Sequence, residues 1–125
     1  MKQPVATDGA PVPIGPYSQG IVCSGRLLFV SGQTAKHPLT GEVPADIRGQ
    51  TERCLENIKA IIEKAGASLA DVVKVNAYLK DMASFAQYNE VYVRYFPKPF
   101  PARTTVGASL AEGTLVEIDA VVALG

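Results

Sequence analysis

Hydrophobic and polar positions follow two different periods along this chain of 125 residues. Between Asp46 and Gly66 the apolar positions recur every three or four residues, which predicts an amphipathic helix about 30 Å long. Asp46 is suited to cap the start of this helix, and Gly66 is suited to end it in a left-handed conformation. The side chains expected on its buried face are Ile47, Cys54, Leu55, Ile58, Ile61, Ile62 and Ala65.

A second amphipathic helix is predicted to end at Phe96. Pro97, Pro99 and Pro101 follow directly and prevent the helix from continuing. The side chains expected on its buried face are Phe85, Tyr88, Val91, Tyr92 and either Tyr95 or Phe96.

Three segments have the alternating pattern of β-strands. Residues 72–79 alternate, with Val73, Val75, Ala77 and Leu79 on one side and Lys74, Asn76 and Tyr78 on the other, which predicts a strand. Residues 102–107 and 114–124 are predicted as two more strands, joined by a turn around Glu112-Gly113.

The first third of the chain contains shorter apolar runs. Residues 18–23 and 26–31 flank Ser24-Gly25, and this arrangement predicts a β-hairpin. The four prolines within residues 1–16 favour an extended arm, and the glycines and prolines within residues 32–45 favour a loop.

The resulting order β-β-α-β-α-β-β predicts an α+β fold in which two helices cover one face of a mixed sheet. The length of 125 residues allows one domain, spanning 1–125, and leaves no room for a second. The other sheet face is expected to carry Val121 and Leu115 beside the carboxylates of Glu117 and Asp119. A face that is half apolar and half charged suits packing against sister subunits around a polar cleft.

Composition narrows the functional classes. The formal net charge is zero, which argues against a general nucleic-acid binder. Cys23 and Cys54 are too few for a disulfide framework and too far apart for a metal site, so we expect free thiols in a reducing compartment. The first residues lack the apolar run of a signal peptide, and no stretch reaches the ~20 apolar residues of a membrane span. We therefore expect a cytoplasmic protein without membrane contact.

Several kinds of chemistry lack their motifs. The chain has no H-x-E and P-C-x-x-C pattern of a zinc deaminase, no P-loop and no G-x-G-x-x-G after a strand. Its single histidine, His37, lies in the Gly/Pro-rich loop and is interpreted as an exposed loop residue. We therefore expect activity without a metal or a bound cofactor.

Two charged residues are candidates for catalysis. Arg103 follows a proline and enters a predicted strand, so its guanidinium offers a well-fixed planar fork for a carboxylate. Glu117 lies on the next predicted strand. If residues 102–107 and 114–124 pair, Arg103 and Glu117 are roughly opposite and share a face. The same arrangement is also explained by a cross-strand salt bridge without function.

Three further positions are candidates with equally simple structural explanations. Tyr17 projects from the loop after Gly15-Pro16, where it is either a ligand contact or a packed aromatic. Gly32, next to Ser31, allows close approach of a ligand to the backbone or simply forms a turn. Asn89 lies in the second predicted helix, where an exposed position is the simpler interpretation.

Together these residues resemble the RidA-like reactive-intermediate (enamine/imine) deaminases of the YjgF/YER057c/UK114 family, and the resemblance covers nearly the whole chain. The segments most similar to the family are Gly15-Pro16-Tyr17-Ser18-Gln19, Val30-Ser31-Gly32-Gln33, Pro101-Ala102-Arg103-Thr104-Thr105-Val106 and Val116-Glu117-Ile118-Asp119-Ala120. The helix segment around Asn57 and the stretch Val75-Asn76-Ala77-Tyr78-Leu79-Lys80-Asp81-Met82 are also similar.

The resemblance implies a chorismate-mutase-like fold and a homotrimer with clefts between subunits. It also implies cofactor-free hydrolysis of 2-enamino and 2-imino acids, such as 2-aminoacrylate, to 2-keto acids and ammonia. In this family the arginine matching Arg103 grips the substrate carboxylate, and the glutamate matching Glu117 holds the attacking water. The positions matching Tyr17, Ser31, Asn89 and Thr105 line the cleft.

The chain differs from the family pattern in a few places that bear on the size of the cleft. Asp119 replaces the more usual second glutamate, Thr105 stands where some relatives carry cysteine, and two loops are slightly shorter. Three other functions remain as alternatives. A protein that binds keto acids without turnover would need Arg103 but not Glu117. RNA cleavage is attributed to some relatives, and the rearrangement catalysed by chorismate mutase shares only the fold.

Overall fold

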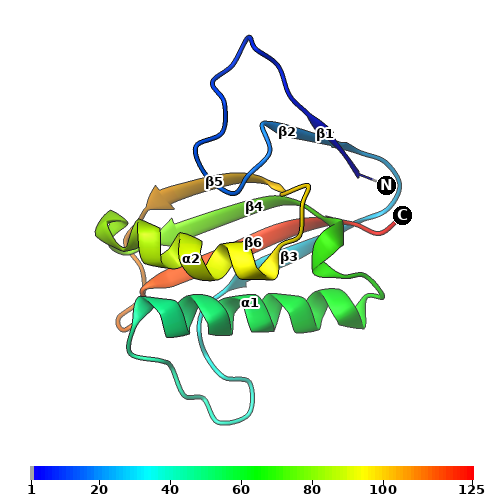
Figure 1. Cartoon of the computed structure of the whole chain (residues 1–125). Helices are drawn as coiled ribbons and strands as arrows, with labels where there is room; N and C mark the ends of the chain where they lie inside the picture. Colours follow the sequence, from blue (N-terminus) through cyan, green and yellow to red (C-terminus); the bar gives the residue numbers. More distant parts are fainter. Residues whose placement is uncertain (1) are drawn as a thin grey trace.

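The computed structural model describes residues 2–125, and Figure 1 shows their arrangement. The strands are β1 (Lys2–Val5), β2 (Gly20–Cys23), β3 (Leu27–Gln33), β4 (Val72–Leu79), β5 (Ala102–Gly107) and β6 (Val116–Ala123). The helices are α1 (Ile47–Lys64) and α2 (Phe85–Tyr95), and the short 3-10 turns Leu69–Asp71 and Met82–Ser84 precede β4 and α2.

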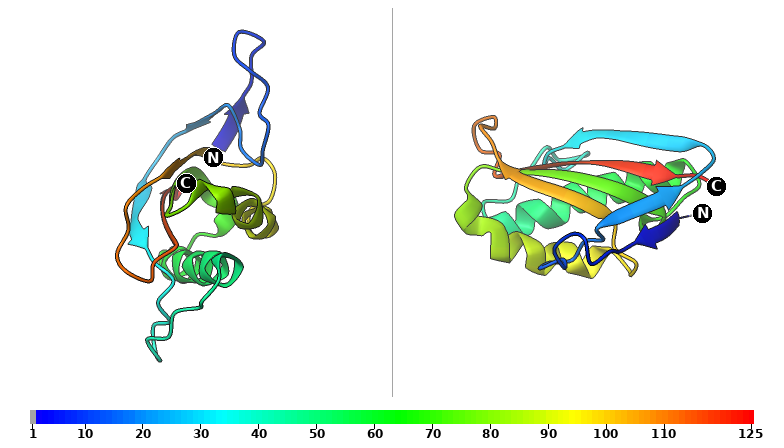
Figure 2. Two further views of the ribbon diagram at one scale, coloured as in Figure 1. Left: turned by 90° about the vertical axis from the view of Figure 1, so that its left-hand side faces the viewer. Right: turned by 90° about the horizontal axis from the view of Figure 1, so that it is seen from above.

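Four strands form the main sheet in the order β3-β6-β4-β5. The strand β5 runs parallel to β4, because the helix α2 connects them and returns the chain to the starting end of the sheet. The last strand, β6, lies between β3 and β4 and is antiparallel to both. Both helices cover one face of this sheet, as two views at right angles show (Figures 1 and 2). The predicted α+β class with two helices on one face of a mixed sheet is therefore confirmed.

The core lies between this sheet face and the two helices. The strand β6 contributes Val116, Ile118, Ala120 and Val122, which alternate with Glu117, Asp119 and Val121 on the opposite face. The helix α1 contributes Cys54, Leu55, Ile58 and Ile62, and α2 contributes Tyr88, Val91 and Tyr92. Ile61 and Ala65 were expected on the buried face of α1, but both are exposed.

The predicted helix ends are confirmed. The Asp46 carboxylate accepts a hydrogen bond from the Gly49 backbone N–H at 3.3 Å, which caps one of the free donors at the start of α1. Gly66 has a φ of +86°, a conformation that glycine adopts without a steric penalty. The helix α2 ends at Tyr95, with Phe96 as its cap.

The predicted hairpin between the first two apolar runs is wrong, although both runs are strands. The strand β2 pairs with β1 in a separate two-stranded sheet, so the first residues of the predicted arm are also a strand. The strand β3 pairs with β6 instead. The C-terminus holds this arrangement, because the Leu124 N–H donates to the Arg26 carbonyl at 2.8 Å and Gly125 packs against Gly25.

The sheet face opposite the helices is not covered by any part of residues 2–125 in the way that α1 and α2 cover the other face. Phe29 is 71% exposed on it, and Leu27 and Val121 add further apolar surface. Glu117 and Asp119 alternate with the buried residues of β6 and so belong to this face. The mixed apolar and charged character was predicted, but Leu115 was misplaced, because it packs against the core.

Candidate active site

Arg103 is held on the helix-covered side of the sheet. In the parallel pair of β4 and β5 it lies opposite Val75, whose side chain is fully buried beneath the helices. Residues in register on neighbouring strands point to the same face, so the Arg103 side chain extends toward α2. Because β5 is the edge strand, the guanidinium remains only half-buried.

The Arg103 guanidinium is fixed by α2. Its Nη1 donates to Asn89 Oδ1 at 2.7 Å and makes a longer contact of 3.5 Å to the Tyr88 hydroxyl. The guanidinium carbon lies 4.6 Å from the centre of the Tyr92 ring and 5.4 Å from that of Tyr88. The rings of Phe85 and Tyr17 lie at 5.6 and 5.8 Å. Aromatic faces attract a cation but do not neutralise it.

No carboxylate pairs with this guanidinium within residues 2–125. The one ion pair of 4 Å or less in this part of the chain joins Arg48 and Glu90, on the exposed surface between α1 and α2. Arg103 therefore has a fixed orientation and an uncompensated charge. Its remaining N–H donors can bind an anion, and a carboxylate matches the fork best.

A small hollow opens beside Arg103. It has a volume of about 210 Å³ and is lined by Ile14, Tyr17, Phe85, Arg103 and Thr105. The lining combines one cation and one hydroxyl with apolar and aromatic surface. Such a hollow suits a small molecule that carries one carboxylate and a short apolar group.

The loop that carries Tyr17 is tied to the start of β5. The Ser18 N–H donates to the Pro101 carbonyl at 3.1 Å, and the Ser18 hydroxyl donates to the Phe100 carbonyl. The Tyr17 hydroxyl in turn accepts from the Ile14 N–H at 3.4 Å. These bonds place the Tyr17 ring beside Arg103, as expected for a residue that lines a site.

Tyr88 and Thr105 form the inner wall of the same region. Their hydroxyl oxygens lie 3.2 Å apart. Burial raises the pKa of Tyr88, so its phenol remains protonated and neutral at physiological pH. Tyr92 is also fully buried, its pKa is raised by burial, and its hydroxyl has no hydrogen-bond partner within residues 2–125.

A second group of candidate residues lies on the open sheet face. Glu117 alternates with the buried Val116 and Ile118, so its side chain is on the side away from the helices. The register between β3 and β6 shifts between Val30 and Gln33, which marks a β-bulge at Ser31-Gly32. A Cβ atom at Gly32 would collide with the Glu117 carboxylate, so only glycine leaves that carboxylate its place.

The expectation that Arg103 and Glu117 share a sheet face is wrong. The strand β4 separates β5 from β6, and the two side chains emerge on opposite faces. The structural salt bridge considered as an alternative is excluded by the same geometry. Of the predicted site residues, Tyr17, Asn89 and Thr105 lie with Arg103, whereas Ser31 and Gly32 lie with Glu117. The candidate residues therefore form two groups on opposite sheet faces, which we call the Arg103 half-site and the Glu117 half-site.

Sequence reasoning missed the aromatic surroundings of Arg103. Phe85, Tyr88 and Tyr92 recur at helical spacing and were interpreted only as the buried face of α2. The signal that could have identified them is that two buried residues of this face are tyrosines, whose hydroxyls need polar neighbours. Ile14 could not be identified from the sequence, because it lies in a loop without periodic pattern. Its side chain is 97% exposed.

The single histidine, His37, has a structural role. His37 Nδ1 accepts from the Leu39 and Thr40 N–H groups at 3.1 and 3.2 Å, which shapes the loop before α1.

Within residues 2–125, no three His, Cys, Asp or Glu side chains gather as a metal site would require. Neither helix in this part of the chain has the length and apolarity needed to cross a bilayer.

An α+β fold with a small hollow beside an unpaired arginine is typical of proteins that bind small molecules. Comparisons with known proteins specify it further. The family described as Endoribonuclease L-PSP matches residues 7–124. A RutC family protein of Pyrococcus horikoshii is 54% identical over 123 residues, covering 97% of each chain. The chain belongs to this family, whose members also carry the names RidA and YjgF.

Two relatives from Escherichia coli have more specific names. One, 42% identical over 125 residues and covering 97% of each chain, is named 2-iminobutanoate/2-iminopropanoate deaminase. The other is a solved structure titled as TdcF with bound serine. It is 37% identical, it superimposes with a TM-score of 0.76, and the match covers 98% of this chain and 99% of that one.

Proposed function

We propose that this protein hydrolyses reactive 2-enamino and 2-imino acids, such as 2-aminoacrylate, to 2-keto acids and ammonia without a cofactor. The observation that carries this proposal is the oriented Arg103 guanidinium without an anionic partner, beside a hollow of about 210 Å³. The name of the deaminase from Escherichia coli supports the same reaction, and the serine bound to TdcF is a small amino acid with a carboxylate.

The chemistry requires binding, orientation and one activated water. An enamine first tautomerises to its imine, whose C=N carbon is electrophilic. Water adds to that carbon, and the resulting carbinolamine loses ammonia to leave the 2-keto acid. Arg103 holds the substrate carboxylate, and Glu117 orients the water or accepts its proton. Tyr17 and Thr105 line the cleft around the substrate, and Ser31 and Gly32 present backbone beside Glu117.

The two half-sites meet in this proposal between neighbouring copies of the chain. Arg103 and Glu117 lie on opposite sheet faces, so the Glu117 half-site of one copy faces the Arg103 half-site of the next. The exposed Phe29 and the half-buried Val121 on the open face supply apolar surface for such contacts. We therefore propose a homotrimer with clefts between subunits, each copy contributing residues 1–125 as a single domain. We place it in the cytoplasm, because Cys23 and Cys54 are both free thiols.

The test is a coupled assay in which a serine or threonine dehydratase generates the enamine in situ. The appearance of the keto acid is followed with and without the protein. The wild type is expected to accelerate it, and Arg103→Ala is expected to lose about 100-fold or more of the catalytic efficiency, since the fork contributes both binding and orientation. Arg48→Ala is the matched control, because Arg48 is an exposed arginine that does not line the hollow. Acceleration by Arg103→Ala equal to that of the wild type would contradict the role of the fork.

A second candidate function is the binding of keto acids without turnover. The separation of the half-sites favours it, because Arg103 alone can bind a carboxylate. Glu117→Gln distinguishes the two functions. If Glu117→Gln loses hydrolysis but still binds 2-oxobutanoate, the deaminase is supported. If the wild type binds 2-oxobutanoate but does not accelerate hydrolysis, the binding protein is supported. RNA cleavage, suggested by the family description, has no electrostatic support in a chain of zero net charge.

A further inference from the structure

The partner that orients Arg103 is an amide rather than a carboxylate. Asn89 Oδ1 accepts from Arg103 Nη1 at 2.7 Å, which is a short and well-formed hydrogen bond. Arginines that are partly buried usually pair with Asp or Glu, because an unpaired charge is costly to bury. An amide oxygen fixes the guanidinium in the same way but carries no net charge.

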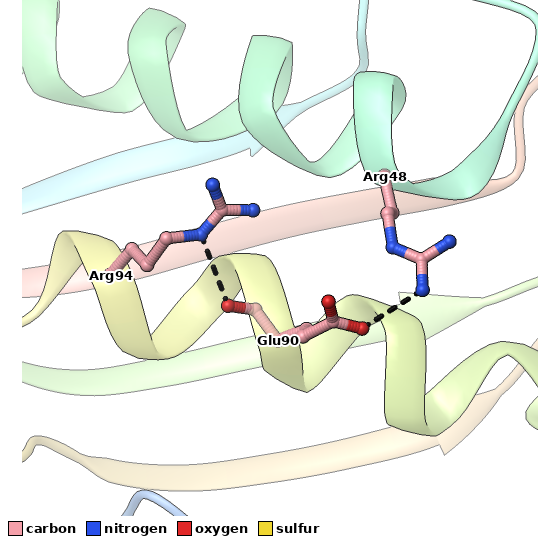
Figure 3. A network of polar contacts seen from close by, with 3 residues as sticks. All are labelled: Arg48, Glu90 and Arg94. Carbon is pink, nitrogen blue, oxygen red and sulfur yellow. Dashed lines mark hydrogen bonds and ion pairs between the residues drawn. The ribbon is translucent and has the colours of Figure 1, made fainter.

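The other neighbours of this guanidinium are also neutral. Tyr88 stays protonated because burial raises its pKa, and the faces of Tyr92 and Phe85 contribute only aromatic surface. The nearest carboxylate along α2 is Glu90, the residue directly after Asn89. Figure 3 shows that Glu90 reaches toward α1, where it pairs with Arg48 at 2.9 Å.

We propose that Asn89 is a positioning residue whose neutrality keeps the charge of Arg103 available for the carboxylate of the ligand. This inference rests on the proposed function and deepens it, because Asn89 then acts through Arg103 rather than by touching the substrate. A carboxylate at this position would accept from the same Nη1, form an internal ion pair and compete with the ligand.

Replacement by an isosteric acid separates charge from geometry. Asn89→Asp keeps an acceptor oxygen in place, whereas Asn89→Ala removes it. If Asn89 only holds Arg103 in place, the aspartate should restore what the alanine loses. If neutrality matters, the aspartate should be the more harmful of the two. Gln87→Glu is the charge control, since Gln87 lies on the same helix and its side chain makes no hydrogen bond within residues 2–125.

The measurement is the dissociation constant of 2-oxobutanoate by calorimetry at neutral pH, together with KM and kcat in the coupled assay. We expect Asn89→Asp to raise the dissociation constant and KM about tenfold or more, as for loss of a charge-assisted hydrogen bond, with a smaller change in kcat. We expect a smaller rise for Asn89→Ala and none for Gln87→Glu. Should Asn89→Asp fail to fold, Thr105→Asp compared with Thr105→Asn places the same charge beside Arg103 from β5.

Binding by Asn89→Asp as tight as that of the wild type would overturn the inference, and so would Thr105→Asp binding as tightly as Thr105→Asn. Absence of 2-oxobutanoate binding by the wild type would overturn it as well. The proposed function fails separately. If the wild type binds 2-oxobutanoate but does not accelerate imine hydrolysis, the proposed deaminase function is contradicted. The dissociation constants of the wild type, Asn89→Asp and Asn89→Ala still test the role of Asn89.

Discussion

At the scale of single residues, Gly32 is the position where a missing side chain matters most. It lies in the bulge of β3, directly against the carboxylate of Glu117 on β6. Bulges are common beside active sites because they redirect a short piece of strand without disturbing the rest of the sheet. Here the bulge removes a side chain from the space that Glu117 occupies.

We predict that Gly32→Ala lowers kcat about tenfold or more, because the added Cβ displaces the Glu117 carboxylate and misplacement of a catalytic group is costly. The coupled assay measures the effect, and a thermal melt verifies that the variant is folded. Gly20→Ala is the matched control, since a Cβ at Gly20 would meet its nearest neighbour, the Val5 side chain, at an ordinary 3.8 Å. Full activity of Gly32→Ala would show that the place of this carboxylate does not limit the reaction.

The sequence predicted most of the residues that the structure brings together, but not how they are grouped. Arg103, Tyr17, Asn89 and Thr105 form one half-site through contacts between β5, α2 and the preceding loop. No local pattern reports such contacts, because they depend on which strands are neighbours. Local pattern and the family resemblance identified the residues, and only the sheet order separates them into two half-sites.

At the scale of elements, local sequence patterns predicted whether a segment is a helix or a strand better than they predicted which strands pair. The caps at Asp46 and Gly66 and the proline run after Phe96 are encoded within a few residues, so the helix limits could be predicted. Strand pairing is not local. The parallel pair β4 and β5 follows from the helix between them. That rule leaves the other edge of β5 free, so it does not determine where β6 pairs. Insertion of the last strand between β3 and β4 has no signal in its own sequence.

One buried polar side chain connects three of these elements. Gln50, on α1, is 1% exposed. Its Nε2 donates to the carbonyls of Pro44 and Gly113 at 2.9 and 2.8 Å, and its Oε1 accepts from the Leu115 N–H at 2.8 Å. The helix therefore holds both the loop before it and the turn that leads into β6, the strand of Glu117.

We predict that Gln50→Leu lowers the free energy of unfolding by about 2–4 kcal/mol, because it removes three partly buried hydrogen bonds to the backbone. Chemical denaturation at one fixed protein concentration measures the change. The same substitution at Gln87, whose side chain makes no hydrogen bond within residues 2–125, should alter stability by less than about 0.5 kcal/mol. Equal stability of the wild type and Gln50→Leu would mean that water satisfies the three backbone groups instead.

At the scale of the whole molecule, the proposed reaction brings the two half-sites together only between two copies of the chain. The helices occupy one face of the sheet, and the other face presents Phe29, Val121 and the carboxylates of Glu117 and Asp119. Such a surface is too polar for a core and too apolar for full exposure to water. Contact between copies accounts for both properties, since it buries the apolar part and leaves the carboxylates at a cleft.

We predict that two inactive variants restore each other. Arg103→Ala and Glu117→Gln, unfolded and refolded together in equal amounts, should recover about a quarter of the wild-type activity, because a cyclic trimer assembled at random joins the intact Arg103 to an intact Glu117 in that share of its clefts. The control mixture combines Arg103→Ala with the double variant, which forms no intact cleft. Activity of the first mixture no higher than that of the control would place both residues in the same chain's site, or leave Glu117 without a role.

The position of Arg103 and Glu117 on opposite faces of one sheet also has a thermodynamic consequence. A ligand that spans both half-sites of the proposed trimer binds the assembled form more tightly than the separated chains, so it shifts the association equilibrium by mass action. Under the proposed function, the keto acid and the imine therefore also stabilise the assembled form. On dilution, specific activity declines before any chain unfolds, and the concentration at which this occurs falls as the ligand concentration rises.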